Sequence, residues 1–191
     1  MTYILSAFEA EARALIDKYN LVKTKSGKYV LYKNEELLVF ISGMGQDNAH
    51  KATQYLLLNF PNKKDDLFIN LGICAAQNFY EIGQLLQIYK LQDTQESYLL
   101  KTVNSDIQSV SCFSSTKVLN RPVNEDIAEM EAMSIYKEVR TYFKPSHISF
   151  LKVVSDNFNP VKFNKGFIIS LMNKNLDPIM QHIQNMKEIN L

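Results

Sequence analysis

The sequence predicts an α/β fold, in the form of a three-layer α/β/α sandwich around a central mixed β-sheet. Short apolar runs typical of buried strands alternate with segments of helical periodicity, which favours strands joined by helices. Strand pairs separated only by a short turn add antiparallel neighbours, so the sheet should be mixed. A chain of 191 residues, 46% of them apolar, can bury one substantial core, and we expect a single domain over 1–191.

The N-terminal part of the chain carries a strand, a helix and a hairpin. The apolar run TYILSAF over 2–8 predicts a buried strand. A helix follows over 9–20, where apolar residues recur at helical spacing and acidic residues occupy the first turn, which suits the helix dipole. Two further runs, 28–33 and 36–42, flank Asn34 and predict a hairpin.

The middle of the chain begins with a glycine turn, GMG over 43–45, and continues with a helix over 47–60. Asp47 is the expected N-cap of this helix, and Pro61 stops it. A buried strand is predicted next, over the mainly apolar run DLFINLG. Together with this strand at 66–72, later strands are predicted over 84–91, 97–103, 107–113 and 147–155.

Two stretches of helical periodicity complete the pattern. The segment 124–143 predicts a helix at least in its second half. The C-terminal tail is mostly helical, and Pro178 should kink or break it. Strands and helices therefore alternate to the end of the chain.

Composition argues against several classes of function. The net charge is +1 and the basic residues are scattered, which gives no support for nucleic-acid or anionic-membrane binding. No apolar run approaches the roughly 20 residues of a membrane span, and the N-terminus lacks the features of a signal peptide. We therefore expect a cytoplasmic protein that binds neither nucleic acid nor membrane.

The residue types that commonly bind metals and cofactors form no recognisable motif. Cys74 and Cys112 lie in apolar runs, which predicts buried free thiols. The three histidines have no metal-like spacing, and GMG lacks the third glycine of a dinucleotide fingerprint. We therefore expect no metal and no cofactor.

Polar and glycine-containing segments follow several predicted strands directly. Glu9 and Glu11 follow the first strand, and the GMG turn follows the hairpin. GICAA ends the strand that begins at Asp66, and Ser155 with Asp156 ends the last strand. Ligands of open α/β sheets bind at the carboxyl ends of the strands. We therefore expect these segments to gather around one pocket, in which the acids face a polar ligand.

Five segments carry a resemblance to a known family, and they occur in the family's order: ILSAFEAEARAL, VFISGMGQDNAHKAT, FINLGICAA, EMEAMSIYKEV and LKVVSD. They resemble motifs of the nucleoside phosphorylase/nucleosidase family, most closely of its 5′-methylthioadenosine/S-adenosylhomocysteine nucleosidase branch. The resemblance extends over nearly the whole chain. The chain is shorter than typical members between about 93 and 128 and again after Asp156.

The resemblance implies a catalytic acid at Asp156. The family's reaction cleaves the bond between a purine and ribose, and negative charge flows into the base. A carboxylic acid that protonates N7 of the base makes it a better leaving group. Asp156 matches that acid, and Ser155 would orient it. From the residues alone, the favoured interpretation of Ser-Asp is a turn that ends a strand.

The resemblance assigns the ribose to Glu131 and Met130. Two ribose hydroxyls suit a carboxylate acceptor, and the family uses the second Glu of Glu-Met-Glu in this way, with Met against the sugar. It also implies a short strand through Glu129 and a helix that begins near Glu131. The local pattern alone indicates a solvated helix face with a methionine in the core.

Glu11 distinguishes a hydrolase from a phosphorylase. In the nucleosidase branch the position of Glu11 carries the glutamate that polarises the attacking water. The alternative for Glu11 is simple dipole complementarity in a first helical turn. The phosphate-binding Arg and Ser of the phosphorylases correspond to Asn70 and Ile73, which argues against phosphate as co-substrate.

Two positions depart from the nucleosidase pattern. Ile73 stands where nucleosidases have a serine near the water and ribose, which removes a hydroxyl from the site. Lys152 stands where they have an arginine that helps to hold the water; the charge is kept but the planar fork is lost.

Aromatic and apolar residues complete the expected pocket. Phe113 matches an aromatic that stacks on the base, although a core position is equally compatible with the residues. Phe8 and Met44 match apolar positions that line the sugar and its 5′ substituent, and Phe158 or Phe163 would close that end.

The resemblance therefore implies a hydrolase of the N-glycosidic bond of a purine nucleoside, with 5′-methylthioadenosine or S-adenosylhomocysteine as the first expected substrates. It also implies a homodimer. Two alternatives stay open: a purine nucleoside phosphorylase of the same fold, and a nucleoside-binding protein whose catalysis has decayed.

Overall fold

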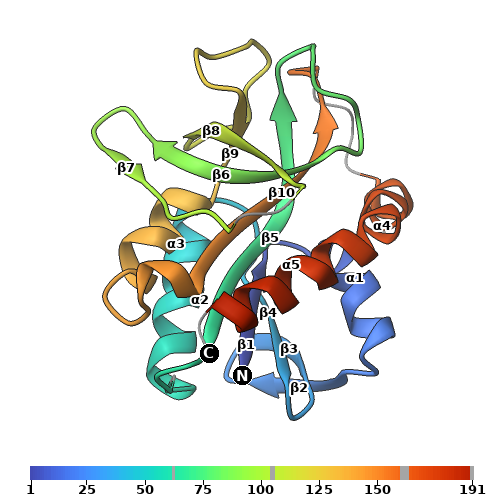
Figure 1. Ribbon diagram of the computed structural model, residues 1–191, viewed down its shortest axis with the longest axis vertical. Coiled ribbons are helices and arrows are strands. Elements are labelled where there is room, and N and C mark those ends of the chain that lie inside the picture. The colour runs from blue at the N-terminus through green and yellow to red at the C-terminus, as the bar shows by residue number, and fades with distance from the viewer. Residues whose placement is uncertain (62, 104–105, 160–163, 190–191) are drawn as a thin grey trace.

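The computed structural model describes the chain except residues 62, 104–105, 160–163 and 190–191 (Figure 1). None of the helices in this part of the chain combines the length and the hydropathy needed to cross a membrane.

The first half of the chain follows the predicted order of elements. Its elements are β1 (Thr2–Ser6), α1 (Glu9–Lys18), β2 (Val22–Ser26), β3 (Tyr29–Lys33), β4 (Leu37–Ile41), α2 (Gln46–Asn59) and β5 (Leu67–Ala76). The prediction missed β2, because this exposed edge strand has no apolar alternation. It was also wrong about the N-cap of α2, which is Gly45 with a φ of 92° instead of Asp47. Asp47 lies in the first turn, where its charge still suits the helix dipole.

The second half contains β6 (Leu85–Gln92), β7 (Ser97–Leu99), β8 (Gln108–Ser114), β9 (Ile127–Glu129), α3 (Ala132–Val139), a 3₁₀ turn (Pro145–His147), β10 (Ile148–Asp156), α4 (Lys165–Lys174) and α5 (Leu176–Ile189). The short strand through Glu129 and the following helix are confirmed. The strand predicted over 97–103 ends at Leu99. Pro178 lies in the first turn of α5, where its missing N–H needs no partner, and the break falls at Asn175.

Within the described residues, ten strands form one mixed sheet in the order β10-β6-β8-β9-β5-β1-β4-β3-β2, with β7 beside β6. β10 also pairs with β5, so the strands β5, β10, β6, β8 and β9 close into a ring. The predicted mixed α/β sheet is confirmed. A three-layer sandwich does not fully describe it, because one half of the sheet is a small barrel. Barrel closure depends on pairings between distant strands, which local sequence patterns do not encode.

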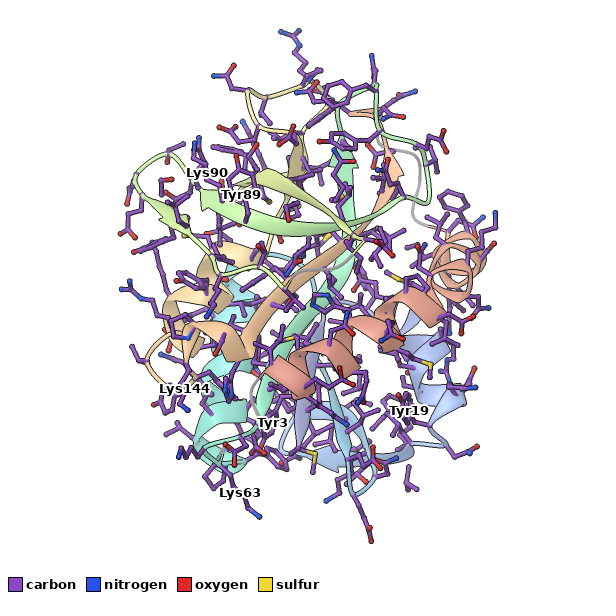
Figure 2. All side chains as sticks on the ribbon, in the orientation of Figure 1. Tyr3, Tyr19, Lys63, Tyr89, Lys90 and Lys144 are labelled. Atoms are coloured by element: carbon purple, nitrogen blue, oxygen red, sulfur yellow. The ribbon has the colours of Figure 1, made fainter. Side chains whose placement is uncertain are left out.

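Helices cover both faces of the open half of the sheet. Phe68 and Phe150 face a core shared with α2 and α3, whereas the next residues, Ile69 and Leu151, face a second core shared with α1, α4 and α5. Figure 1 shows α2 and α3 on one side of β5 and α1 with α4 on the other. Charged side chains such as Lys144 project from the surface, as Figure 2 shows.

The strands β1, β4, β5 and β10 run parallel, and their carboxyl ends therefore lie at one edge. β1 pairs with β4 and with β5, and β5 pairs with β10 in the same direction. The segments that follow these four strands meet at this edge, as the sequence predicted.

Candidate active site

A cavity of about 320 Å³ lies at the carboxyl ends of the parallel strands. Its lining includes most of the predicted site residues, although not Phe113 or Lys152. Those in the lining are Phe8, Glu11, Met44, Ile73, Met130, Glu131, Ser155 and Asp156. Side chains distant in the sequence thus converge on one hollow, as expected.

Glu11 is held in the first turn of α1 by two backbone groups. Its Oε2 accepts the N–H of Phe8 at 2.8 Å, which is half of a capping box, and its Oε1 accepts the N–H of Ile73 at 3.0 Å. The residue is only 3% exposed. Burial raises the pKa of Glu11 to about 7, although the Phe8 N–H and the charge of Lys152 oppose this rise. A carboxylate with such a pKa can accept a proton near neutral pH.

Glu131 lies between two helices. It is the N-cap residue of α3, and its Oε1 accepts the N–H of Gly45 at 2.7 Å, at the start of α2. Gly45 has a φ of 92°, a conformation that favours glycine and that turns this N–H towards the carboxylate. Burial first, and then the charge of Glu129, raise the pKa of Glu131. The N–H of Gly45 thus anchors Oε1, and the backbone of Met130 also interacts with the carboxylate.

Asp156 ends β10 where the register with β5 shifts. The Oγ of Ser155 lies 3.0 Å from Asp156 Oδ2 and 3.1 Å from the carbonyl oxygen of Cys74, and its one hydrogen is shared between these two acceptors. Oδ1 of Asp156 has no hydrogen-bond partner among the described residues. The predicted contact between Ser155 and Asp156 is therefore present, and one oxygen of the acid is uncommitted.

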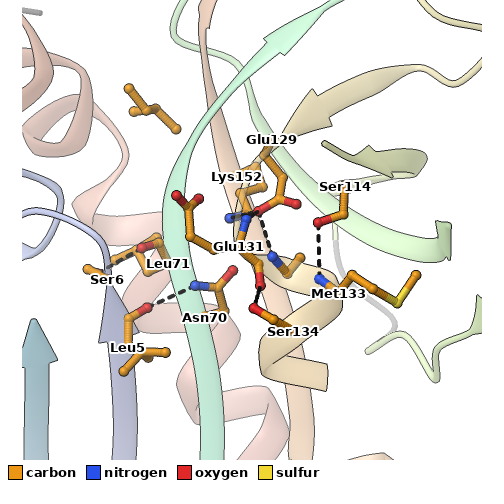
Figure 3. Close-up of polar contacts among 12 residues, drawn as sticks. Leu5, Ser6, Asn70, Leu71, Ser114, Glu129, Glu131, Met133, Ser134 and Lys152 are labelled. Carbon is orange, nitrogen blue, oxygen red and sulfur yellow. Dashed lines mark hydrogen bonds and ion pairs between the residues drawn. The ribbon is translucent and has the colours of Figure 1, made fainter. Parts of the chain in front are cut away.

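Lys152 lies beneath the cavity wall, where Figure 3 shows it against Glu129. Its Nζ is 3.0 Å from Glu129 Oε2, and both side chains are 1% exposed. Burial opposes the charge of Lys152, but Glu129, Glu131 and Glu11 outweigh it and raise its pKa. A Cβ at Gly72 would lie 3.1 Å from Glu11 Oε1 and 3.3 Å from Lys152 Nζ, so glycine here lets these groups come close. Glu129 was not predicted as a site residue, because its role depends on this contact with another strand.

The aromatic positions differ from the expectation. Phe113 is half-buried on β8 and does not line the cavity, because the alternation of the strand turns Cys112 and Ser114 to the buried face and Phe113 away. Residues of the following loop line it instead: Ser115, Lys117, Val118 and Leu119. Phe158 is buried elsewhere, and Phe163 is outside the described residues. Phe167, at the start of α4, does line the cavity.

Small apolar side chains form the wall between these charged groups. Ile73, Cys74 and Ala75 line the cavity from β5, and Ala128 lines it from β9. Both cysteines are buried free thiols, as predicted, and burial raises the pKa of Cys74. Among the described residues, no cluster of three or more His, Cys, Asp or Glu side chains could hold a metal ion.

Comparison with known proteins identifies the fold. Neither a model of a known family nor a curated protein matches the sequence. Among solved structures, a putative 5′-methylthioadenosine/S-adenosylhomocysteine nucleosidase from Francisella philomiragia is similar at 12% identity and a TM-score of 0.79, over 96% of this chain and 98% of that one. Arabidopsis thaliana 5′-methylthioadenosine nucleosidase is 15% identical, with a TM-score of 0.80 over 97% and 95%. Futalosine hydrolase of Helicobacter pylori is 14% identical, with a TM-score of 0.74 over 98% and 97%. The chain therefore has the fold of these nucleosidases, which the resemblance predicted.

Proposed function

We propose that this protein hydrolyses the N-glycosidic bond of a purine nucleoside of the 5′-methylthioadenosine or S-adenosylhomocysteine type. The observation that carries the proposal is the convergence of Glu11, Glu131 and Asp156 on one cavity. Three acids in these positions match the three tasks of the reaction: activation of water, binding of the sugar and protonation of the leaving base. The similar nucleosidase structures support the same reaction class.

Asp156 acts as the general acid. As the bond between C1′ and the base breaks, its electron pair moves into the purine, and the protonated carboxyl of Asp156 donates its proton to N7. Oδ1, which has no partner among the described residues, is available for this contact, while the Ser155 hydroxyl holds Oδ2.

Glu11 acts as the general base. Water attacks C1′ of the oxocarbenium-like sugar, and the carboxylate of Glu11 accepts the proton that the water loses. The two backbone N–H groups on its oxygens fix the orientation of the carboxylate, and each oxygen keeps a lone pair for the water.

The remaining lining residues bind the nucleoside. The carboxylate of Glu131 accepts a hydrogen bond from the ribose, and Met130 packs against the sugar. Phe8 and Met44 line the 5′ substituent together with Phe167, which takes the place expected for a later phenylalanine. Stacking on the base by Phe113 is not part of the proposal, because Phe113 does not line the cavity.

Charge favours water over phosphate as the nucleophile. The cavity wall carries the carboxyl groups of Glu11, Glu131 and Asp156, whereas Lys117, which is exposed, is the one cationic residue among the described lining residues. Asn70 is buried, and its amide donates to the carbonyl oxygen of Leu5. A phosphate ion would therefore meet mainly like charge at this site.

One observation favours a second candidate, a nucleoside-binding protein without turnover. Lys152 does not line the cavity, and Ile73 offers no hydroxyl, so Glu11 alone among these three can hold the attacking water. Tight binding of the nucleoside with no release of base would identify this function.

Incubation with a panel of purine nucleosides, with and without phosphate, tests the proposal by detection of free base. We expect release of base from 5′-methylthioadenosine at the same rate in both conditions. Release that requires phosphate would establish a phosphorylase instead. Binding without release would establish the second candidate.

A further inference from the structure

The first turn of α3 is capped by a residue outside the helix. Glu131 stands at the N-cap, but its side chain accepts no hydrogen bond from the helix. Instead, Oε2 of Glu129 accepts the N–H of Glu131 at 2.9 Å and that of Ala132 at 2.8 Å. The Oγ of Ser114 accepts the N–H of Met133 at 3.1 Å. Of these three, the N–H of Met133 at position N2 is one that an N-cap side chain usually serves. The carboxylate of Glu131 is therefore free to turn away from its own helix.

Glu129 is itself held by Lys152, which lies on β10. The same Oε2 that accepts the two backbone N–H groups lies 3.0 Å from Lys152 Nζ. Glu129 is one of the residues that line the cavity, but its side chain is only 1% exposed, and its Oε1 has no hydrogen-bond partner among the described residues. Its Oε2 is occupied by Lys152 and by two backbone N–H groups, one of which belongs to Glu131.

We propose that Glu129 is a positioning residue, which fixes the backbone of Glu131 so that the Glu131 carboxylate meets the ribose hydroxyls. This inference rests on the proposed function. Two anchors then define the orientation of Glu131: Glu129 holds its N–H, and Gly45 holds its Oε1. The carboxylate so held lines the cavity, where the sugar would bind.

A purely structural role for the pair explains less. An uncharged cap would serve the same N–H groups, and a buried ion pair is often no more stabilising than apolar residues of similar size. What the ion pair adds is a fixed orientation of the Glu129 carboxylate. Because Lys152 belongs to β10 and Glu129 to β9, the contact ties the start of α3 to the strand that ends in Ser155 and Asp156. The sugar-binding acid and the base-binding acid are thus set on one rigid unit.

The test compares a ribonucleoside with its counterpart that lacks both hydroxyls. We expect Glu129→Gln to lower kcat/KM for base release from 5′-methylthioadenosine by about tenfold or more, mainly through KM. Release from the 2′,3′-dideoxy counterpart should change less than about threefold, because Glu131 has no hydroxyl to hold there. Glu129→Asp keeps the charge but shortens the side chain, and it too should lower kcat/KM for 5′-methylthioadenosine more than for the dideoxy counterpart. In a Glu131→Gln background, Glu129→Gln should cause little further loss.

Glu125→Gln is the matched control, because Glu125 is also a buried glutamate, bonded by Gln92 and outside the cavity lining. It should leave both substrates unaffected, and thermal unfolding should verify that each variant is folded. Equal losses for both nucleosides in the Glu129 variants would overturn the inference and leave a merely structural role. Failure of the unmutated protein to release base from any nucleoside would instead overturn the proposed function, before any variant is made.

Discussion

The two ends of the cavity are built in opposite ways. At the glutamate end, formed by Glu11, Glu131 and the Glu129–Lys152 pair, the anchoring carboxylate oxygens accept backbone N–H groups or an ammonium. At the aspartate end, Asp156 is half-buried, one of its oxygens has no partner among the described residues, and its neighbour Ser155 supplies its hydrogen bond. The acids at the glutamate end are therefore held by backbone N–H groups or an ammonium before a ligand arrives, whereas Asp156 is held by the hydroxyl of Ser155.

The largest expected effect is that of Asp156→Asn, which should lower activity and leave stability nearly unchanged. Asp156→Asn should lower kcat by about 10²–10⁴-fold, at the upper end of what a general acid contributes, because an amide cannot protonate N7. The midpoint of thermal unfolding should stay close to that of the unmutated protein, since the Ser155 hydroxyl can still donate to the amide oxygen. Turnover near the original rate would contradict the assignment of the acid.

Glu11→Gln should cost both activity and stability, because Glu11 is anchored at the opposite end. Loss of the base should lower kcat by about 10²–10³-fold. The amide nitrogen would also face one of two backbone N–H groups, from Phe8 or Ile73, and leave that donor unsatisfied. We expect a loss of about 1–3 kcal/mol in the free energy of unfolding, measured by denaturant titration. Retained stability would show that these two hydrogen bonds do not anchor Glu11.

Lys152→Met should affect stability most, because it leaves Glu129 buried without a counter-charge. We expect the free energy of unfolding to fall by about 3–5 kcal/mol. Lys117→Gln is the control at the exposed rim and should change it by less than about 0.5 kcal/mol. A small effect of Lys152→Met would indicate that the glutamate end is not fixed by this pair.

The predictions from sequence succeeded where position along a strand decides the outcome. Glu11 follows β1 and Asp156 ends β10, and these parallel strands have their carboxyl ends at one edge of the sheet. Glu131 reaches the same cavity at the start of α3, after β9, which runs antiparallel to β5. The prediction did not reach the contact between Glu129 and Lys152, because that contact depends on the closure of the barrel. Burial and neighbouring charge, which set the pKa of Glu11, are equally invisible to a local pattern.

The prediction that Phe113 lines the pocket was wrong, because a local pattern also does not fix which face of a strand a residue takes. The alternation of β8 decides which face a side chain takes, and a shift of one residue reverses it. The loop after β8 carries no periodic pattern, so its contribution of Lys117, Val118 and Leu119 to the cavity could not be anticipated from the residues. The prediction was therefore weakest for this loop, which begins beside β9, where the N–H of Ser115 donates to the carbonyl oxygen of Glu129.

The pH dependence sharpens the comparison further. Glu11 has a pKa of about 7, and it must be ionised to accept a proton, so kcat/KM should fall about tenfold for each pH unit below 7. Stability should change in the other direction. The folded protein binds this proton more tightly than the unfolded chain, so the stabilisation is fully present below 4.5, the ordinary pKa of a glutamate, and is lost as pH rises through about 7. Denaturant titrations at several pH values should show that slope, and Glu11→Gln should remove it.

The smallest expected effect concerns two phenylalanines, one that lines the cavity and one that does not. Phe167 lines the cavity from α4, whereas Phe113 does not line it. An aromatic contact of this kind contributes about 0.5–1.5 kcal/mol, so Phe167→Leu should raise KM for 5′-methylthioadenosine about two- to tenfold. Phe113→Leu should leave KM unchanged. The reverse outcome would mean that the cavity wall rearranges when the nucleoside binds and brings Phe113 onto the base. Only in that arrangement would Phe113 have the stacking role that the resemblance implies.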